Sequence, residues 1–557
     1  MDRPWLQQYP PGVPADVDVH AYASLPALLN ESFARHAERP ALRFMGQDVR
    51  YAQLDADSRA LAAWLQAQGL VRGDRVALMM PNVPQYAVAV AAVLRAGLVV
   101  VNVNPLYTAR ELEHQLKDSG ARAIVILENF AATLEQVLPQ VPTKAVLLAS
   151  MGDMLGPLKG AVVNHVVRRI RQLVPAFRLP EAVRWREALA AGRRGVFQPP
   201  TLGPDDIAVL QYTGGTTGVS KGAVLLHRNL VANMLQSEAW NQPALAQLAP
   251  AEQYVNICAL PLYHIFAFTT CLLLGIRLGG LNVLIPNPRD LPATIKALAA
   301  QRFHSLPAVN TLFQALAHHP DIAHVDFGAL KVCIGGGMAV QSATARLWLE
   351  KTGCPIVEGY GLSETSPSAT CNPVDSSSFT GTIGLPLPGT DVMLLDDHGH
   401  AVPPGTPGEI AIRGPQVMAG YWQRPDETAK VMTADGFFRT GDIGTMDARG
   451  WLRIVDRKKD MILVSGFNVY PNEVEDVITQ MPGVLECAAV GVPDPKAGEA
   501  VKVVVVKQDP AVTEHDIRAF CEANLTGYKR PKLVEFRAEL PKTPVGKILR
   551  RELRDAA

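Results

Sequence analysis

Residues 212–223 read Tyr-Thr-Gly-Gly-Thr-Thr-Gly-Val-Ser-Lys-Gly-Ala, and the rest of the chain is best interpreted outward from this stretch. Three glycines and three threonines follow one another shortly before Lys221, and an apolar run at 207–210 precedes them. Glycine backbone can fold closely around an oxyanion, and its N–H groups and the threonine hydroxyls can donate hydrogen bonds to phosphate oxygens. The stretch therefore predicts a phosphate-binding loop in which Lys221 supplies a positive charge.

The spacing within this loop argues against the P-loop of nucleoside triphosphatases and kinases. That motif requires a glycine, four residues, and then Gly-Lys followed by Ser or Thr. Counted from Gly214, Val219 occupies the position of the second glycine, and Gly222 follows the lysine. The sequence thus favours a phosphate loop of another kind.

Composition narrows the classes of protein further. The 557 residues exceed one ordinary domain, and 53 basic residues balance 53 acidic residues, so no net charge attracts nucleic acid or another polyanion. Seven cysteines without a CxxC pair indicate a reducing compartment and neither a disulfide framework nor a zinc site. The N-terminal residues lack the apolar segment of a signal peptide, so the cytoplasm is the expected location.

The segment 257–286 is apolar and long enough to resemble a membrane span. It contains Pro261, His264, Arg277 and the pair Gly279-Gly280, which favour a helix and a strand buried inside the protein.

Helical and extended patterns alternate between residues 17 and 210. Strands are predicted at 75–80, 98–103 and 123–127, and a helix at 84–96. Thr108-Ala-Arg-Glu111 is a capping-box signature, which predicts a helix from there to Gly120. Such an alternation favours a mostly parallel sheet with helices on both faces.

The segment 159–174 carries valine, isoleucine and leucine at helical spacing beside Lys159, Arg168, Arg169 and Arg171. A basic amphipathic helix of this kind can lie on an anionic membrane surface, or it can pack on its own domain. The second alternative is favoured, and peripheral membrane contact is kept as the other.

Several polar residues follow strand-like runs in the second half of the chain. His264 lies in an aromatic segment at 259–268, and a glycine turn follows a strand at 335–337. Glu364 and Ser363 follow another strand, where the carboxylate could hold a hard cation and the hydroxyl could bond a phosphate. Asp442 stands at a strand end, a position suited to ribose hydroxyls.

The chain beyond residue 456 has the pattern of a small separate unit. The charged run 456–460 lies between two strand-like segments, as a linker or hairpin corner would. Helices are predicted at 473–481 and 516–524, and strands at 487–492 and 501–506, which form an α+β unit of about a hundred residues. Lys547 lies near its end in a loop bounded by proline and glycine, from which it could reach an anionic centre elsewhere.

Taken in order, these segments resemble the acyl-adenylate-forming enzymes along nearly the whole chain. The resemblance covers residues 212–223, 259–268, 335–337, 360–365, 440–442, 457–476 and 541–547. Within that family, 435–459, 460–473 and 525–529 resemble the bacterial long-chain-fatty-acid–CoA ligases. The resemblance implies an α/β protein whose large N-terminal domain, 1–456, contains layered sheets with flanking helices. A hinge at 457–460 and a small mobile α+β C-terminal cap domain at 461–557 would follow.

The implied reaction has two steps. A fatty carboxylate attacks the α-phosphorus of ATP to give acyl-AMP and pyrophosphate, and the thiol of CoA then displaces AMP. Mg²⁺ is the implied cofactor, with Glu364 and Thr216 as its ligands. The implied catalytic residues are Lys547, Glu364, Lys459 and His264. The implied ATP- and AMP-binding residues are Thr213, Gly214, Gly215, Thr216, Thr217, Gly218, Lys221, Gly337, Glu358, Gly359, Tyr360, Ser363, Asp442 and Arg457. The implied acyl and CoA channel contains His264, Phe268, Ser465, Gly466 and Phe467.

In this scheme Lys547 bridges the carboxylate and the α-phosphate, and Lys459 is the hinge residue. Phe268 stands where some long-chain relatives carry a tryptophan gate. A medium-chain or aryl-acid CoA ligase, a fatty acyl-AMP ligase that loads a carrier protein, and a non-catalytic lipid- or nucleotide-binding regulator are the alternatives. Chain-length preference and oligomeric state, including a homodimer, stay open at this point.

Overall fold

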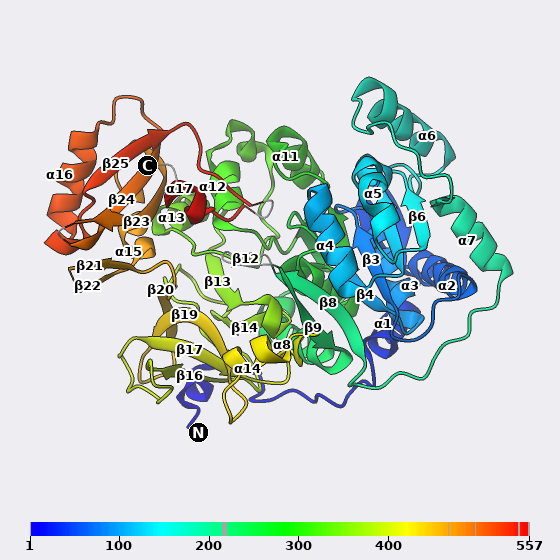
Figure 1. Cartoon of the computed structure of the whole chain (residues 1–557), viewed down its shortest axis with the longest axis horizontal. Helices are drawn as coiled ribbons and strands as arrows, with labels where there is room; N and C mark the ends of the chain where they lie inside the picture. Colours follow the sequence, from blue (N-terminus) through cyan, green and yellow to red (C-terminus); the bar gives the residue numbers. More distant parts are fainter. Residues whose placement is uncertain (1, 214–219, 466, 496, 544–545, 555–557) are drawn as a thin grey trace.

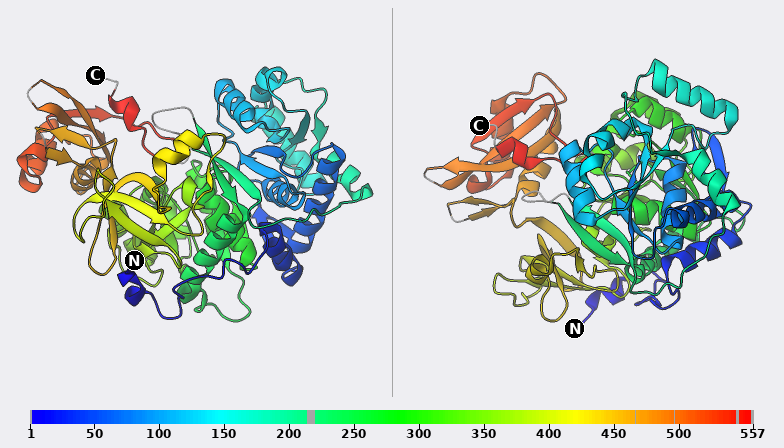
Figure 2. Two further views of the ribbon diagram at one scale, coloured as in Figure 1. Left: turned by 60° about the horizontal axis from the view of Figure 1, so that its bottom comes forward. Right: turned by 45° about the vertical axis from the view of Figure 1, so that its right-hand side comes forward.

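The computed structural model describes residues 2–213, 220–465, 467–495, 497–543 and 546–554. Figure 1 shows a large part, residues 2–456, beside a small C-terminal part with a sheet of its own, residues 461–554. We call these two parts the body and the lid. Figure 2 shows from two further sides that the lid lies against one flank of the body.

An eight-stranded sheet forms one half of the body. Its strand order is β18-β9-β8-β4-β3-β5-β6-β7. The strands from β8 to β7 in this order are parallel, while β9 pairs antiparallel with β8 and β18 with β9. The strands are β3 Arg75–Met79, β4 Val99–Asn102, β5 Ala123–Leu127, β6 Ala145–Ala149, β7 Val183–Arg184, β8 Ile207–Thr213, β9 Lys221–Leu226 and β18 Gly420–Tyr421.

Both faces of this sheet are buried. Along β3, Val76 and Leu78 belong to one hydrophobic core, and the alternate residues Ala77 and Met79 belong to another. Because strand side chains alternate between faces, the sheet carries a core on each side. The first core includes the helices α1 Leu25–Arg35, α2 Tyr51–Ala67, α3 Pro84–Arg95 and α7 Trp185–Arg194, and the second includes α4 Ala109–Ser119 and α5 Ala131–Val137. The predicted parallel sheet with helices on both faces is confirmed.

Helix α4 shows how the sequence sets element ends. The Thr108 hydroxyl accepts a bond from the N–H of Glu111 at 3.4 Å, and the Glu111 carboxylate accepts one from the N–H of Thr108 at 2.8 Å. At the other end Gly120 takes a left-handed φ of 62°, which glycine adopts without strain. The predicted capping box and helix end are both confirmed.

Two four-stranded sheets complete the centre of the body, with orders β10-β11-β1-β2 and β12-β13-β14-β15. Their strands are β1 Pro40–Phe44, β2 Gln47–Arg50, β10 Val255–Cys258, β11 Leu281–Leu284, β12 Cys333–Gly335, β13 Ile356–Gly361, β14 Ser368–Cys371 and β15 Leu385–Pro386. Nearby helices are α8 His227–Leu245, α9 Ile265–Ala267, α10 Leu274–Arg277, α11 Leu291–Ala299, α12 Asn310–His318 and α13 Ser342–Thr352.

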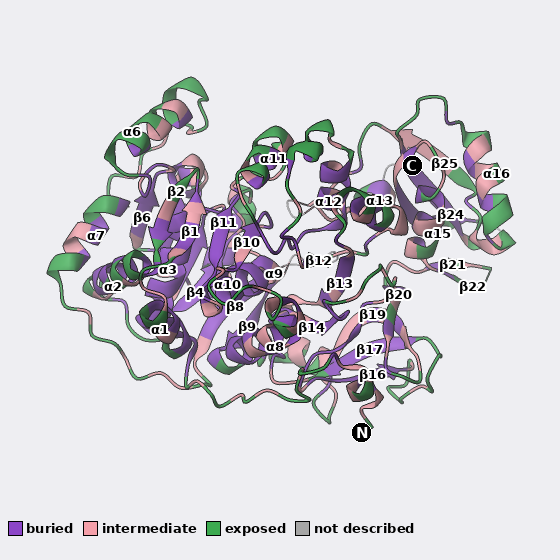
Figure 3. Cartoon of the chain, turned by 180° about the vertical axis from the view of Figure 1, so that it is seen from behind, coloured by how far each residue is buried: buried purple, intermediate pink, exposed green. Residues whose placement is uncertain are grey.

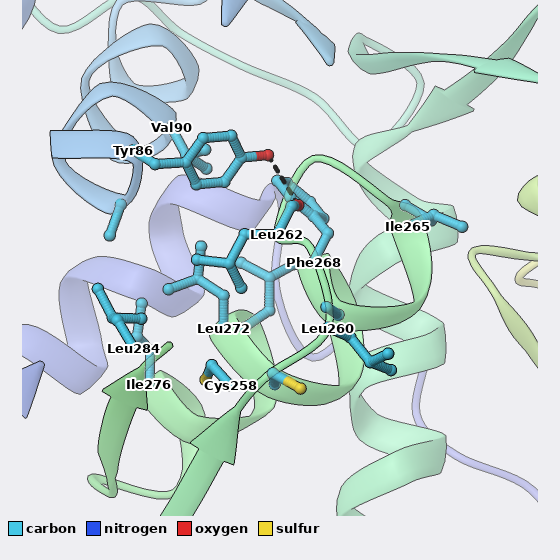
Figure 4. Close-up of a cluster of buried hydrophobic side chains, with 14 of the residues drawn as sticks. Tyr86, Val90, Cys258, Leu260, Leu262, Ile265, Phe268, Leu272, Ile276 and Leu284 are labelled. Atoms are coloured by element: carbon cyan, nitrogen blue, oxygen red, sulfur yellow. Dashed lines mark hydrogen bonds between the residues drawn. The ribbon is translucent and has the colours of Figure 1, made fainter. Parts of the chain in front are cut away.

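The apolar segment 257–286 is buried in this region, as predicted. It consists of the end of β10, short helices joined by a π-helical turn at Phe268–Leu273, and β11. Figure 4 shows Phe268 among Leu260, Leu262 and Leu272 in the hydrophobic core. No helix in the described part of the chain is long and apolar enough to cross a membrane.

A smaller antiparallel sheet, β16-β17-β19-β20, leads into the lid. Its members are β16 Asp391–Leu395, β17 Gly408–Arg413, β19 Phe438–Met446 and β20 Leu452–Arg457, and α14 Pro425–Val431 precedes β19. Because β20 ends at Arg457, the body's last strand passes directly into the segment 458–460.

The lid has its own five-stranded sheet and hydrophobic core. The strand order is β22-β21-β24-β23, and β25 runs parallel to β24. The central hairpin is longer than the predicted strands, because pairing continues from Val484 opposite Lys507 to Asp494 opposite Gly498. The elements are β21 Ile462–Val464, β22 Phe467–Val469, α15 Pro471–Thr479, β23 Val484–Asp494, β24 Gly498–Lys507, α16 Glu514–Asn524, β25 Leu533–Arg537 and α17 Arg550–Arg554.

The basic segment 159–174 forms a helix that projects from the body, remote from the lid (Figures 1 and 3). Helix α6, Pro157–His165, continues as a π-helical turn at Val166–Ile170, so the helical part ends earlier than predicted. Arg168 holds the turn to the body through two hydrogen bonds to Glu128 at 2.9 and 2.8 Å. The exposed large apolar residues of this segment are Leu158, Val162, Ile170 and Leu173.

Candidate active site

A cavity of about 1410 Å³ lies between the body and the lid. This volume exceeds the roughly 300–1,000 Å³ that holds one drug-sized ligand. Of the predicted site residues that the structure describes, the following line it: Thr213, Lys221, His264, Gly337, Gly359, Tyr360, Ser363, Glu364, Arg457, Lys459 and Lys547. Residues more than 300 positions apart are therefore brought to one space.

The phosphate-loop end of the cavity is formed where β8 turns into β9. Thr213, the last residue of β8, pairs with Lys221, the first residue of β9. The predicted phosphate ligands Gly214, Gly215, Thr216, Thr217 and Gly218 lie between them, outside the described residues.

The ammonium group of Lys221 forms an ion pair with Glu427 of α14. The nitrogen also lies 5.1 Å from the centre of the Tyr421 ring. The hydrogen bond from Lys221 lowers the pKa of Glu427 to about 2. Glu427 thus pairs with the positive charge of Lys221, as a bound phosphate would.

Glu364 lies in a 3₁₀ turn, Ser363–Thr365, directly after β13. It is buried, and one carboxylate oxygen accepts a hydrogen bond from the Tyr421 hydroxyl at 2.7 Å. Burial raises the pKa of Glu364 above its ordinary value. A nearby cation would favour the ionised form, so this carboxylate suits a hard metal ion.

Mg²⁺ commonly takes only one or two protein carboxylates and completes its shell with water and phosphate oxygens. The described residues contain no group of three or more His, Cys, Asp or Glu side chains that could enclose a metal by themselves. The single buried carboxylate of Glu364 fits a magnesium site that has few protein ligands.

The next group joins the end of β13, the middle of β19 and the last residue of β20. The sequence predicts Asp442 at a strand end, whereas the structure places it within β19. The Tyr360 hydroxyl donates to Asp442 at 2.7 Å, and the guanidinium of Arg457 lies 3.4 Å from the other oxygen of Asp442. Asp442 and Arg457 are direct partners in the β19–β20 ladder. The register of this sheet therefore places the two charged residues side by side, with Arg457 lining the cavity and Asp442 behind it.

A glycine turn forms the opposite wall of this part of the cavity. Gly337 has a φ of 78°, and a side chain at Gly336 would approach the Phe266 ring and the Gly359 carbonyl to 3.1 Å. Glycine is therefore required for the close approach of these segments.

Glu358 lies behind this wall, outside the lining. Its carboxylate accepts a hydrogen bond from the N–H of Val340 at 2.9 Å, and burial raises its pKa to about 8. The sequence predicts that Glu358 contacts the adenine, whereas the structure shows a buried carboxyl group beneath the glycine turn.

Lys547 enters the cavity from the lid. The surrounding protein withdraws its ammonium group from water and, together with the nearby charge of Arg457, lowers its pKa to about 7. His264 lies in the same part of the cavity, and its Nδ1 accepts a bond from the N–H of Phe266 at 3.3 Å. Burial, with Lys547 nearby, lowers the pKa of His264 to about 4, so this imidazole is neutral at pH 7.

Arg550 anchors the segment that carries Lys547. Its guanidinium donates to the Glu475 carboxylate at 2.8–3.1 Å and to the Asn472 side chain at 2.8 Å. Both partners belong to α15 of the lid, so Lys547 and this helix are held in a fixed relation.

An apolar extension of the cavity is lined by residues of α8, α10 and β12 and by the residue that follows β15. Its lining includes Trp240 of α8, Leu274, Ile334 and Leu387. None of these was identified from the sequence, and neither were Tyr421 and Glu427, since their neighbours are distant in the chain and no local motif marks them.

Three predicted channel residues are not brought to the cavity. Phe268 is fully buried in the core, where Tyr86 donates to the Leu262 carbonyl at 2.9 Å beside it (Figure 4). Phe467 is 56% exposed on the lid, and its ring stacks on that of Tyr528 with the ring centres 4.7 Å apart. Ser465, two positions before it, does not line the cavity either. Gly466 lies outside the described residues.

Comparison with known proteins gives consistent results along the chain. A family model described as AMP-binding enzyme matches residues 29–422, and one described as AMP-binding enzyme C-terminal domain matches 473–547. A long-chain-fatty-acid–CoA ligase of Escherichia coli (strain CFT073) is 55% identical over 558 aligned positions, covering 100% of this chain and 99% of that protein. A feruloyl-CoA synthase of an Amycolatopsis species is 36% identical over 92% of this chain and 95% of that protein. The crystal structure of ATP-bound MatB from Rhodopseudomonas palustris superposes with a TM-score of 0.78 at 30% identity, covering 96% of this chain and 98% of that one.

Proposed function

The chain belongs to the AMP-binding enzyme family, and we propose that it converts long-chain fatty acids to acyl-CoA thioesters through an acyl-AMP intermediate. ATP supplies the adenylate, and pyrophosphate and AMP are released. The observation that carries this function is the 55% identity, over the full length, to a long-chain-fatty-acid–CoA ligase. The geometry supports it, because Lys547 of the lid and Arg457 at the hinge face one large cavity.

In the first half-reaction the chain's main tasks are to position the substrates and to neutralise charge. Lys221 and the loop 213–218 bind the β- and γ-phosphates, and Asp442 and Arg457 hold the ribose. Gly337, Gly359 and Tyr360 frame the adenine, with Glu358 behind them, and Ser363 lies beside the α-phosphate.

Lys547 bridges the fatty carboxylate and the α-phosphate, where negative charge accumulates. His264 is neutral and lies at the acyl end of the site. Glu364, with Thr216, would hold Mg²⁺, which neutralises phosphate charge when it is bound with ATP.

In the second half-reaction the lid turns about the hinge 457–460, with Lys459 as its hinge residue, and Lys547 leaves the cavity. The face that contains Ser465, Gly466 and Phe467 then lines the path of the CoA thiol. The exposure of Phe467 in the present orientation supports this assignment, because a side chain that is free of the body can approach it after rotation.

The apolar extension beside Trp240, Leu274 and Leu387 suits the acyl chain. At ~0.8 kcal/mol per buried methylene, eleven methylenes contribute about 9 kcal/mol of transfer free energy. Such an enzyme therefore binds long acids far more tightly than short ones, provided that the extension accommodates the whole acyl chain.

The test is a product assay with ATP, Mg²⁺, CoA and a series of acids from C6 to C18, with ferulic acid as an aryl arm. We expect AMP and acyl-CoA in equal amounts, with the highest kcat/KM for long chains. A maximum at C6–C8 or with ferulic acid would identify the medium-chain or aryl-acid alternative. AMP release without a thioester would indicate a ligase that loads a carrier protein.

We also propose that the helix α6 and the turn after it contact an anionic membrane surface from the cytoplasmic side. Leu158, Val162 and Ile170 are exposed on this projecting segment, and Arg169 and Arg171 are exposed beside them. Apolar side chains next to arginine are the features by which interfacial helices bind anionic lipid.

Co-sedimentation with phosphatidylglycerol-containing vesicles tests this contact. Val162→Ser with Ile170→Ser should lower the bound fraction, whereas Val196→Ser, at another site that is 80% exposed, should leave it unchanged. Equal binding of all variants would refute the contact without affecting the catalytic proposal.

A further inference from the structure

Helix α13 of the body begins without a capping side chain of its own. Its N-terminal flanking residue, Gln341, makes no side-chain capping bond. The first N–H groups of a helix lack acceptors within the helix and require them from outside. Here the acceptor is Asp476, which belongs to α15 of the lid. Its Oδ1 accepts bonds from the N–H of Ser342 at 3.3 Å and from the Ser342 hydroxyl at 2.6 Å.

Helix α15 of the lid likewise begins without its own cap, since Tyr470 makes no capping bond. The N–H of Asn472, in the first turn, donates to Asp456 of β20 at 2.9 Å. Asp456 is buried on the body's side of the hinge, and its other oxygen accepts from the N–H of Arg457 at 2.7 Å. The two parts of the chain thus exchange helix caps: the body caps a lid helix, and the lid caps a body helix.

Three further polar contacts between described residues of the body and the lid differ in kind. The Gln314 side chain donates to the Leu485 carbonyl, the Thr311 hydroxyl lies 3.5 Å from the Gly546 carbonyl, and Arg289 lies 3.4 Å from the Thr543 carbonyl. In each of these the acceptor is a neutral backbone oxygen of the lid. Asp476 instead brings a carboxylate to a helix N-terminus, which is the favourable end of the helix dipole for negative charge.

Both caps are present in the lid orientation that places Lys547 in the cavity. Asp456 lies next to the hinge, whereas Asp476 lies on the lid surface that must leave α13 when the lid turns. We propose that Asp476 is a positioning residue for adenylation: it latches the lid to the start of α13 and so keeps Lys547 at the reacting carboxylate. Release of this latch precedes thioester formation. The proposal rests on the proposed function, because the two half-reactions are its readout.

The first test separates the half-reactions in Asp476→Ala. Loss of a capping side chain shifts the lid equilibrium by about fivefold, within a range of about 2- to 30-fold. We expect fatty-acid-dependent ATP–pyrophosphate exchange to fall by that factor. Acyl-CoA formation from supplied acyl-AMP should be unchanged or faster. Asp476→Asn should restore exchange, because asparagine caps helices as well as aspartate.

Glu473→Ala is the matched control, since Glu473 lies on the same helix but pairs with Lys529 inside the lid at 2.7 Å. It should leave both half-reactions unchanged. An equal fall of both half-reactions in Asp476→Ala, or failure of Asp476→Asn to restore exchange, would overturn the latch.

The second test reads lid orientation without activity. The native cysteines are all buried, so spin labels can be directed to Val196→Cys on the body and Glu522→Cys on the lid. Asp476→Ala should reduce the population at the main inter-label distance of the ligand-free protein, and Asp476→Asn should retain it. An unchanged distance distribution in Asp476→Ala would overturn the latch. If the unsubstituted chain made no acyl-CoA, the proposed function would fail while this measurement still decided the latch.

Discussion

Replacement of Glu358 by glutamine should make the folded chain less sensitive to alkaline pH. Glu358 has a folded pKa of about 8 because it is buried, against an ordinary glutamate pKa of 4.5. A carboxyl with a raised folded pKa takes up a proton on folding, so its stabilising contribution is full below pH 4.5 and is lost as pH rises through 8. Glutamine resembles the protonated carboxyl and still offers an oxygen to the N–H of Val340, which donates to Glu358 at 2.9 Å.

The size of the effect follows from linkage. Proton uptake by Glu358 contributes about 2.7 kcal/mol to the free energy of unfolding at pH 6 and about 0.4 kcal/mol at pH 8. The stability of Glu358→Gln relative to the unsubstituted chain should therefore rise by about 2 kcal/mol over this interval. With an unfolding entropy of about 2.1 cal/mol/K per residue, a body of this length shows a relative gain in Tm of about 2 °C.

Differential scanning calorimetry of both proteins at pH 6, 7 and 8 measures this difference, and the titration of all other groups cancels in it. Glu350→Gln, which changes an exposed carboxyl on α13, is the matched control and should show no trend with pH. A Tm difference that is constant, or that falls as pH rises, would mean that Glu358 is ionised in the folded chain and would refute the reasoning.

Three further predictions concern the reaction. Lys547→Ala should lose acyl-AMP formation by about 10²–10³-fold yet convert supplied acyl-AMP to acyl-CoA at the normal rate, as quenched-flow assays of each step would show; equal losses would contradict its role. Lys459→Pro, which restricts the backbone at the hinge, should retain adenylation and lose thioester formation, and normal overall turnover would exclude rotation about this residue. Glu427→Gln should lower the Kd for ATP by about fivefold or less, measured by calorimetry, because phosphate no longer displaces a carboxylate from Lys221. A weaker affinity would show that Glu427 itself helps to bind the nucleotide.

Much of the site could be predicted because its residues follow strands in a fixed order. Glu364 follows β13 and Arg457 ends β20, so local pattern alone placed both near a strand end, whereas Asp442 lies in the middle of β19. Strands β19 and β20 pair directly, and the hydrogen bond from Tyr360 to Asp442 joins them to β13, which belongs to another sheet.

The other site residues are placed by contacts between distant parts of the chain, which no local sequence pattern encodes. Tyr421 reaches Glu364 from 57 positions away, and Glu427 reaches Lys221 from 206 positions away. Phe268 was assigned to the channel from its place in an aromatic segment. The π-helical turn that begins there directs it into the core instead, and the geometry of that turn is set by tertiary packing.

The link between Arg550 and α15 has a consequence for the order of events in the catalytic cycle. Because the guanidinium fastens the lysine-bearing segment to Glu475 and Asn472, Lys547 cannot withdraw by a local loop movement. In the proposed cycle, its departure requires the whole C-terminal part to travel, and that same movement brings a new face toward the acyl group. In that scheme, activation of the acid and its transfer to sulfur require mutually exclusive orientations of the lid. The CoA thiol then meets the acyl group only after the ammonium group of Lys547 has left the cavity, so the movement of the lid sets the order of the two chemical steps.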